Sequence, residues 1–399
     1  MEREAEVESK RSRLVIPPAC GLRYAATAAA LVLALAISGM AQQARVYREG
    51  SVWIEESTGS LPAAANLSVR MDIGNVNVQG GNHPGIDYTL KKRVRAATQA
   101  EAQRQFELFH FSAARPRPGD LAILSGIVYG ASPTLSGDLQ VQVPRGMQLV
   151  KVAIVKGGNE TVIGVDGRTE VWTSAGNIRV DDIGGAVQAN SGGGNFVVGK
   201  VGGDLTVNTG GGSIHVDSVR GNAVTSTGGG NVYIGSVARA LSVRTGGGSI
   251  EVKQCAGNMN AVTGGGIIRL TSADGPVTAS SRAGAIQLLG LAHGANVHTD
   301  GGGIVAEFLG HDFTASSVQT QNGDIIVYLG PDLKATVQAE VEMANGHHLR
   351  SSLPEIVVTP SGDPSSLRSI RAEGNLKGGG PLLRVRAING DIEFRRAQH

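Results

Sequence analysis

The sequence is short of several residue types on which common functions depend. Only 2 cysteines occur in 399 residues, Cys20 and Cys255; Cys20 lies in a leader that export would remove, so no intramolecular disulfide is expected. Aromatic residues make up 4% of the chain and the net charge is +2. Because no basic patch is interleaved with aromatic residues, nothing supports a nucleic-acid partner.

Long apolar runs are also missing. The apolar run Tyr24–Ile37 is shorter than the roughly 20 residues that cross a bilayer. It follows a basic stretch and precedes small residues, which is the order of a secretory signal. We expect residues 1–41 to be a signal peptide or, if uncleaved, an N-terminal anchor. The protein is then exported to the periplasm, the cell surface or the medium, or held at the inner membrane by that segment alone.

Glycine is abundant, and it is periodic. The chain has 58 glycines and 41% hydrophobic residues, and TGGGSIHV, TGGGNVYI and TGGGSIEV begin at Thr209, Thr227 and Thr245. Eight units of 18 residues align without insertion over about 173–308. One column carries a hydroxyl in every unit: Thr173, Ser191, Thr209, Thr227, Thr245, Thr263, Ser281 and Thr299.

Apolar positions alternate within each unit. Ile214 and Val216 follow the triple glycine, and their equivalents are apolar in the other units. Alternation indicates half-buried strands, and three glycines would be very unfavourable inside a helix. A fixed period places equivalent side chains over one another, with coils about 4.8 Å apart. The predicted fold is all-β: a single-stranded parallel β-solenoid of 18-residue coils, with one short helix near its N-terminal end.

The ends of the array depart from the period. Residues 42–138 are predicted to be strands and a helix that cap the solenoid, the helix opening at the capping box Thr98–Glu101 and reaching about His110. Residues 139–344 form the predicted core, in which the motif recurs near Thr320 with an offset of 21. Residues 345–379, rich in Gly, Ser, Pro and charge, are predicted to be a loop, and residues 380–396 a closing coil.

The triple glycines could bind a ligand or form a turn. A phosphate loop needs a following helix and usually Lys-Ser/Thr, but a strand pattern follows here. A calcium β-roll needs a repeated Asp where these units have an apolar residue, and an ice-binding face would need a broader threonine array. We therefore expect glycines with positive φ at tight corners, beside hydroxyls bonded to the turn backbone. The residues assigned this structural role are Thr209, Gly210, Gly211, Gly212, Ile214, Val216, Thr227, Thr245 and Thr263.

Outward positions do not repeat. The equivalents of His215 are Arg179, Val197, Tyr233, Glu251, Arg269 and Gln287. This column is typical of a varied solvated face, in which Glu251 and Arg269 are expected to form a cross-strand pair. Cys255 replaces valine in an inward column and is expected to be a buried, inert thiol.

No catalytic residue and no cofactor is identified from the sequence. Four residues near the end of the array are weak candidates for a transition-metal site, weighed against ordinary surface histidines: His293, His298, Asp300 and His311.

The recurring G-[DNS]-I-x-V units, the VPRG at Val143–Gly146 and the closing GGGPLLRVRAINGDIEF resemble the bacterial "putative-adhesin" family. This family consists of exported β-strand-repeat proteins, a domain of unknown function similar to autotransporter-adhesin heads. The resemblance covers about residues 46–396. It implies a right-handed solenoid and a cell-envelope location, and it carries no catalytic residue.

The regular interior beside an irregular exterior favours a non-catalytic, exported solenoid that acts as a surface or envelope binding or adhesion-like scaffold. A carbohydrate-active or carbohydrate-binding β-helix protein is the first alternative, and it predicts acidic or aromatic residues converging on one face. An envelope-stress or assembly component is the other. The expected partner is a polysaccharide or an envelope or surface protein.

Overall fold

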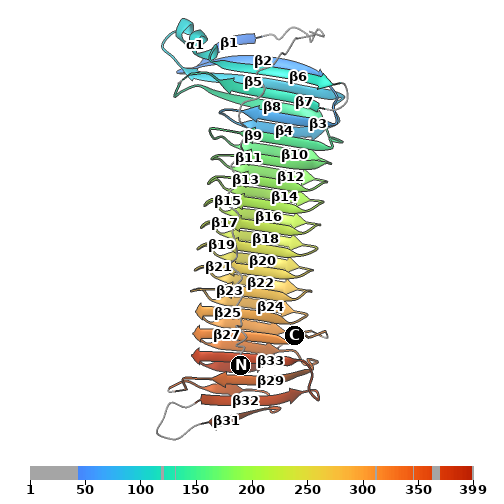
Figure 1. Cartoon of the computed structure of the whole chain (residues 1–399), viewed down its shortest axis with the longest axis vertical. Coiled ribbons are helices and arrows are strands. Elements are labelled where there is room, and N and C mark those ends of the chain that lie inside the picture. The colour runs from blue at the N-terminus through green and yellow to red at the C-terminus, as the bar shows by residue number, and fades with distance from the viewer. Residues whose placement is uncertain are drawn as a thin grey trace, which may run out of the picture. The chain divides into compact units, whose positions relative to one another are not determined.

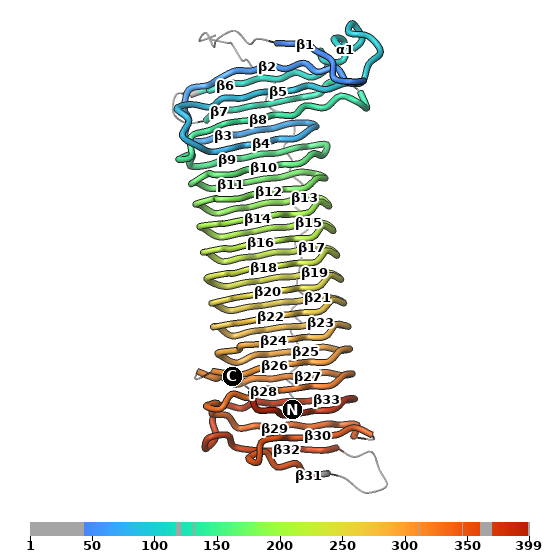
Figure 2. Tube along the Cα trace, turned by 180° about the vertical axis from the view of Figure 1, so that it is seen from behind, coloured from blue at the N-terminus to red at the C-terminus, as the bar shows by residue number. Residues whose placement is uncertain are grey.

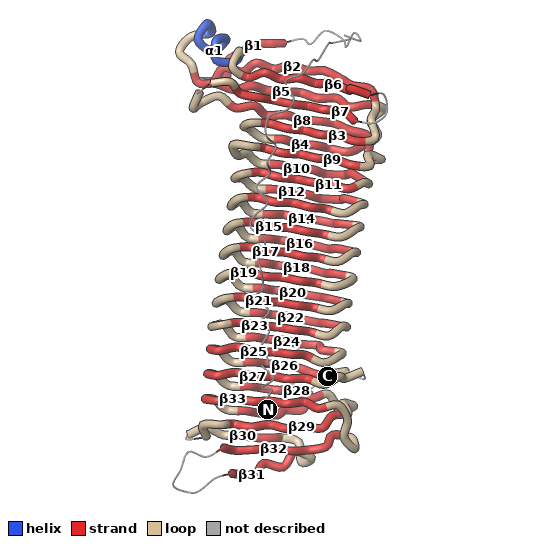
Figure 3. The backbone as a smooth tube through the Cα atoms, viewed as in Figure 1, coloured by secondary structure: helices blue, strands red, loops and turns tan. Residues whose placement is uncertain are grey.

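The computed structural model describes residues 44–117, 121–130, 132–310, 312–344, 346–361 and 369–397. They belong to one compact unit, Gly39–His399, built from strands with one helix, α1 (Gln99–Phe106), in its described part (Figure 3). The all-β prediction is confirmed. Among the described residues, no helix combines the length and apolarity required to span a bilayer. The run Tyr24–Ile37 lies outside the described residues.

Each regular coil supplies one strand to each of two parallel sheets, A and B (Figure 1). The regular strands of sheet A are β10 (Glu160–Val165), β12 (Ile178–Ile183), β14 (Phe196–Val201), β16 (Ile214–Val219), β18 (Val232–Val237), β20 (Ile250–Cys255), β22 (Ile268–Ala273), β24 (Ile286–Leu291), β26 (Ile304–Phe308) and β28 (Ile325–Leu329). Those of sheet B are β9 (Leu149–Ile154), β11 (Arg168–Thr173), β13 (Val187–Ser191), β15 (Leu205–Thr209), β17 (Ala223–Thr227), β19 (Leu241–Thr245), β21 (Met259–Thr263), β23 (Val277–Ser281), β25 (Ala295–Gly301) and β27 (Ser316–Asn322).

The pairing register confirms the 18-residue coil. Ile214 pairs with Val232, and Val232 pairs with Ile250, and all three side chains are buried. Thr299 pairs with Thr320, which confirms the offset of 21. Inward side chains of both sheets join in one continuous apolar core. Each coil therefore buries its apolar face only because its neighbours are present.

At the N-terminal end the stacking order departs from the chain order. The coil formed by β3 (Asn66–Met71) and β4 (Val76–Gly81) lies between β9/β10 on one side and β7 (Leu121–Val128) with β8 (Ser136–Pro144) on the other. Beyond it, β1 (Ala44–Glu49), β2 (Val52–Pro62), β5 (Gly85–Arg95) and β6 (Phe109–Arg117) pair in antiparallel fashion. The expected boundary at residue 138 falls inside β8. These strands cover the end of the core, as Figure 2 shows.

The predicted helix is present and shorter than expected. Thr98 Oγ1 accepts a hydrogen bond from the Glu101 backbone at 3.2 Å, and Glu101 Oε2 accepts one from Ala97 N at 3.1 Å. The first bond is that of a capping box, and in the second Glu101 reaches the residue before the N-cap. The helix ends at Phe106 because the chain turns there into β6, which begins at Phe109.

The C-terminal end corrects two expectations. Strands β33 (Leu382–Asn389) and β34 (Ile392–Arg396) pair directly with β27 and β28, and β29 (Ala335–Val341) lies beyond β33. Residues 380–396, predicted to be a closing coil, are therefore an inner layer of the stack and not its outermost coil. Residues 345–379 are not a loop in their described part: they form β30 (Leu349–Ser351), β31 (Ile356–Ser361) and β32 (Ser369–Leu376). Buried side chains of these strands, such as Ile356 and Leu376, cover the C-terminal end of the core, which would be exposed without them.

The column of buried hydroxyls connects consecutive coils. Thr245 Oγ1 donates to the carbonyl of Gly230, one coil earlier, at 2.8 Å and accepts from the N–H of Gly248 at 3.1 Å. Thr209 and Thr227 repeat both bonds, and Thr263 does the same. Each of these hydroxyls therefore satisfies a backbone carbonyl of the preceding turn and a backbone N–H of its own turn.

The glycines of these turns have a reason other than the one expected. In the coils that contain Gly210–Gly212, Gly228–Gly230 and Gly246–Gly248, no glycine has φ in the left-handed region. Instead, a Cβ at the first or third position would overlap a glycine carbonyl of the preceding coil, whereas the middle position is open. Close approach of stacked turns requires glycine at the first and third positions of each turn.

The arginine of VPRG joins the N-terminal cap to the regular coils. Arg145 donates to Asp166, in the turn after β10, at 2.9 Å and to Asp182, in β12, at 2.7 Å. The hydrogen bond with Arg145 holds the pKa of Asp182 below its usual value. The motif thus has a structural partner in each of two successive coils.

One carboxylic acid interrupts the apolar core. Glu160 is 1% exposed and lies in register between Val76 and Ile178. Neither carboxylate oxygen forms a hydrogen bond of normal geometry in the described part of the chain. Burial raises the pKa of Glu160 to about 9, and the nearby Ile154 backbone lowers it by less. The side chain is therefore protonated in the folded protein at neutral pH.

Two buried threonines should respond oppositely to the same change. Thr225 is as buried as Thr245, but its hydroxyl forms no hydrogen bond with any residue that the structure describes, and its register neighbours are Val207 and Val243. We expect Thr225→Val to raise the unfolding free energy by about 1 kcal/mol and Thr245→Val to lower it by about 2 kcal/mol, because only the latter leaves turn groups unsatisfied. Denaturant unfolding of both variants tests this, and equal signs would contradict it.

Adjacent glycines of one turn should also differ. We expect Gly247→Ala to change stability by less than about 0.5 kcal/mol, since its Cβ meets open space. Gly248→Ala should cost about 1–3 kcal/mol, because its Cβ would overlap the Gly230 carbonyl. Thermal unfolding of the pair is the measurement. A Gly248→Ala variant as stable as Gly247→Ala would show that the turns are not in close contact.

Glu160 predicts a pH dependence. Because its folded pKa of about 9 exceeds the ordinary 4.5, its stability contribution is complete below pH 4.5 and is lost as the pH rises towards 9. The loss by pH 7 is about 3 kcal/mol. We expect Glu160→Ile to raise the melting temperature at pH 7 and to flatten its decline with pH. The exposed Glu373→Leu is the control, and a decline unchanged in Glu160→Ile would refute the assignment.

Candidate functional site

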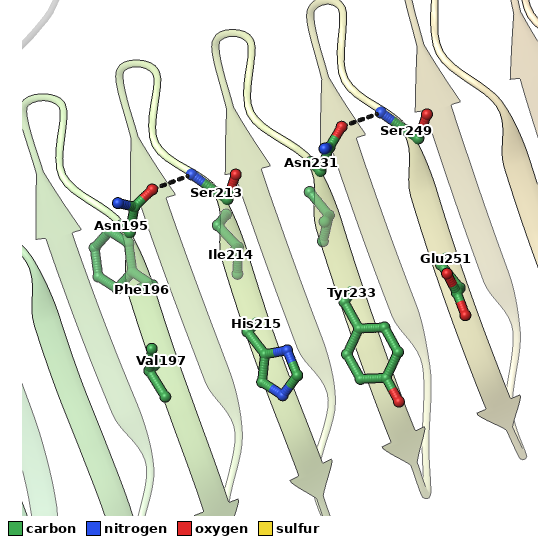
Figure 4. A pocket seen from close by; sticks show the side chains of 11 residues that line it. Asn195, Phe196, Val197, Ser213, Ile214, His215, Asn231, Tyr233, Ser249 and Glu251 are labelled. Carbon is green, nitrogen blue, oxygen red and sulfur yellow. Dashed lines mark hydrogen bonds between the residues drawn. The ribbon is translucent and has the colours of Figure 1, made fainter.

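A groove of about 360 Å³ crosses four consecutive coils on the outer face of sheet A (Figure 4). One wall is a row of outward side chains from equivalent positions on β14, β16, β18 and β20. This row consists of Val197, His215, Tyr233 and Glu251. The other wall is the turn row, one position from each preceding turn: Asn195, Ser213, Asn231 and Ser249. We call this the His215–Tyr233 groove.

The two aromatic rings are stacked. The ring centroids of His215 and Tyr233 are 4.6 Å apart and the ring planes differ by 9°. Parallel strands one coil apart hold equivalent side chains at about the spacing of stacked rings. His215 Nε2 also lies 3.0 Å from Asp217 Oδ1, which orients the imidazole. The pair is a rigid, partly apolar wall.

Lys253 closes the stack on the far side of Tyr233. Its Nζ lies 5.4 Å from the Tyr233 ring centroid, within cation–π range. The hydrogen bond with Tyr233 raises the pKa of Lys253 above its ordinary value. Tyr233 is therefore held between an imidazole and an ammonium group.

The turn row combines structural acceptors with free donors. Asn195 Oδ1 accepts from Ser213 N at 2.8 Å, and Asn231 Oδ1 accepts from Ser249 N at 2.8 Å. These bonds fix the orientation of the two side-chain amides, so the direction in which each Nδ2 group points is fixed as well. The Nδ2 groups of Asn195 and Asn231 form no hydrogen bond with described residues, and both side chains are exposed. They are available to a ligand.

The floor of the groove is strand backbone, because Phe196, Ile214 and Val232 direct their side chains into the core. Ring edges and Val197, which is 40% exposed, provide apolar contact on one wall. Amide and hydroxyl groups provide polar contact on the other. Such a groove suits an extended chain that carries both kinds of group and runs along the stacking direction.

Glu251 and Arg269 do not form the pair expected from the sequence. They are opposite each other in register, but Arg269 Nε donates to Gln287 Oε1 at 3.1 Å. No ion pair within 4.0 Å joins Arg269 to Glu251 in the described structure. Glu251 remains a carboxylate at the end of the groove.

Of the weak metal candidates, the structure brings two together. His298 Nε2 lies 2.9 Å from Asp300 Oδ1, which also accepts from Gln321 Nε2 at 2.8 Å. His293 Nδ1 is buried without a hydrogen bond, and His311 lies outside the described residues. Over the described residues, no three His, Cys, Asp or Glu side chains converge as a metal site would require.

Cys255 is buried, and its Sγ donates to the carbonyl of Gly257 at 3.3 Å. Burial raises the pKa of this thiol, which disfavours the reactive thiolate. The structural residues Thr209, Ile214 and Val216 are buried between the sheets.

The sequence pattern assigns His215 and Tyr233 to a varied solvated face, whereas the structure stacks their rings. The signal that could have identified this pair is the spacing itself. Two aromatic rings 18 residues apart in an outward column must be neighbours in an 18-residue solenoid.

The comparisons with known proteins give limited information. No protein-family model matches the chain, and no curated protein matches it. Among solved structures, a "putative adhesin" from Parabacteroides distasonis is 9% identical, covering 85% of this chain and 96% of that chain, with a TM-score of 0.27. A "putative cell adhesion protein" from Clostridium sporogenes is 7% identical, covering 86% of this chain and 100% of that chain, with a TM-score of 0.19. Scores this low carry no argument about function.

Proposed function

We propose that the protein is a non-catalytic binding solenoid, an adhesion-like scaffold of the cell surface or envelope, and that the His215–Tyr233 groove binds a neutral polysaccharide. The observation that carries the proposal is the stacked pair, which forms one wall of a groove across four coils. Free amide donors form the opposite wall.

A polysaccharide matches the chemistry of both walls. Its sugar rings make apolar van der Waals contact with the exposed sides of the two rings and with Val197, while its hydroxyls accept hydrogen bonds from the Nδ2 groups of Asn195 and Asn231. Because equivalent positions recur about every 4.8 Å along the stack, an extended polymer can meet similar groups coil after coil. Glu251 is the one carboxylate among the lining residues, which favours a neutral ligand.

The same geometry argues against hydrolysis in this groove. Glycoside hydrolysis ordinarily uses two carboxyl groups on either side of the scissile bond, and the groove lining supplies one. The groove is also shallow and open to water, whereas catalytic electrostatic stabilisation is strongest where water is excluded. A binding role needs neither feature.

A surface or envelope location rests on residues 1–41, whose basic, apolar and small-residue segments follow the order of an export signal. A binding scaffold of this kind acts where polysaccharides are present outside the cytoplasm.

The proposal predicts which side chains matter for binding. A neutral glycan array followed by calorimetry on the full chain should identify a bound oligosaccharide. Tyr233→Ala and His215→Ala should each weaken its binding by about three- to tenfold, because each removes half of the stacked wall.

Val224→Ala is the matched control, since Val224 is 45% exposed on sheet B and should leave affinity unchanged. Binding that survives both aromatic substitutions would exclude this groove. Release of shortened chains from a polysaccharide by the purified protein would contradict the non-catalytic assignment.

A further inference from the structure

A second groove, of about 560 Å³, crosses sheet B on its outer face near the glycine turns. Its outward column comes from β17, β19, β21, β23 and β25 and consists of Ser226, Arg244, Val262, Ser280 and His298. The adjoining column has Gly228, Gly246 and Gly264, which leave a trough, and then Arg282 and Asp300. We call this the Arg244–Arg282 groove.

The two arginines of this groove have no protein partner. Arg244 and Arg282 are exposed, and neither forms a hydrogen bond through its guanidinium group or an ion pair within 4.0 Å in the described structure. By contrast, Arg145, Arg371 and Arg386 each bind a carboxylate. Unpaired guanidinium groups are available to bind oxyanions in a bidentate manner.

Their spacing follows from the coil. Arg282 occupies the position of Gly246 two coils later, and Arg244 lies on β19, two positions before Gly246. The two backbone sites are therefore about 10 Å apart along the stack. Val262 lies on the intermediate coil, and in the same column Ser226 precedes Arg244 and Ser280 follows Val262. The trough thus presents two cationic groups on coils about 10 Å apart, with hydroxyl groups and one apolar side chain near them.

The surrounding sheet adds almost no opposing charge. The seven strands β13 to β25 of sheet B contain a single acidic residue, Asp300. Its Oδ1 is already within hydrogen-bond distance of His298 Nε2 and accepts from Gln321 Nε2. Asp300 lines the same groove, so two guanidinium groups face one carboxylate and the groove keeps a net positive charge that attracts anions.

We propose that the Arg244–Arg282 groove binds an anionic polysaccharide, with carboxylate or sulfate groups of different sugar units on the two guanidinium groups. The sugar ring between them lies against Val262, and its hydroxyls contact the flanking serines. This site lies on the other sheet from the His215–Tyr233 groove and stands independently of the function proposed for that groove.

Calorimetry on the full chain tests the proposal with three probes: an oligogalacturonate, which carries carboxylates, a heparin-derived sulfated oligosaccharide, and a neutral oligosaccharide. At least one anionic probe should bind, and its affinity should fall as ionic strength rises. Arg244→Gln and Arg282→Gln together should weaken that binding about tenfold, and each alone about threefold to fivefold. Which anionic probe binds more tightly distinguishes carboxylate from sulfate recognition.

Arg239→Gln is the matched control, since Arg239 is an exposed arginine at the opposite turn of its coil, and it should leave affinity unchanged. The proposal is overturned if neither anionic probe binds, if the double variant binds as tightly as the wild type, or if Arg239→Gln loses as much. If Tyr233→Ala lost binding of the anionic probe and the double arginine variant kept it, the proposal would be overturned. The probe would then bind in the His215–Tyr233 groove.

Discussion

The parallel backbone pairing of consecutive coils is the interaction on which the rest of the structure depends. Strands of five or six residues cannot fold alone, because one coil buries too little apolar surface to offset the entropy of ordering its backbone. Pairing above and below satisfies the backbone groups, and the buried hydroxyls extend the same connection into the turns. Interior positions are restricted to side chains that can be buried for this reason. The first and third turn positions are restricted to glycine because the turn of the preceding coil lies so close.

Coil pairing leaves the residue type at outward positions free to vary, and it also fixes where those outward side chains lie. An outward side chain contributes little to stacking, so its identity can vary between coils. The register nevertheless places equivalent outward positions in straight rows. A binding surface can therefore be assembled from one residue per coil, as in the His215–Tyr233 groove, without a loop insertion or any change to the core. The two grooves are variations in outward columns on two faces of one regular core.

The ends show how a repeat of this kind is terminated. A parallel stack would otherwise expose unpaired strand edges and the apolar end of the core, both of which favour association with other chains. At each end the chain leaves the stack, forms antiparallel strands, and returns to an inner position. Strand β33 meets β27 although 67 residues separate Ser316 from Leu383. Completion of the core at this end depends on a contact between distant segments.

The sequence by itself determined the regular interior. A period of 18 with alternating apolar residues, as at Ile214, Val216 and Val232, has few physical solutions other than stacked strands, and the capping box at Thr98 located the helix. Only the tertiary structure decided the insertion of β33, the strands within residues 345–379, the close approach of the stacked glycine turns and the isolation of Glu160. Each of these depends on which surfaces meet across the stack, and local pattern does not contain that information. Local pattern determines the grooves only in part. The spacing alone places His215 beside Tyr233. Packing decides the orientation of their rings, the fixed amides of the turn row and the unpaired state of Arg244 and Arg282.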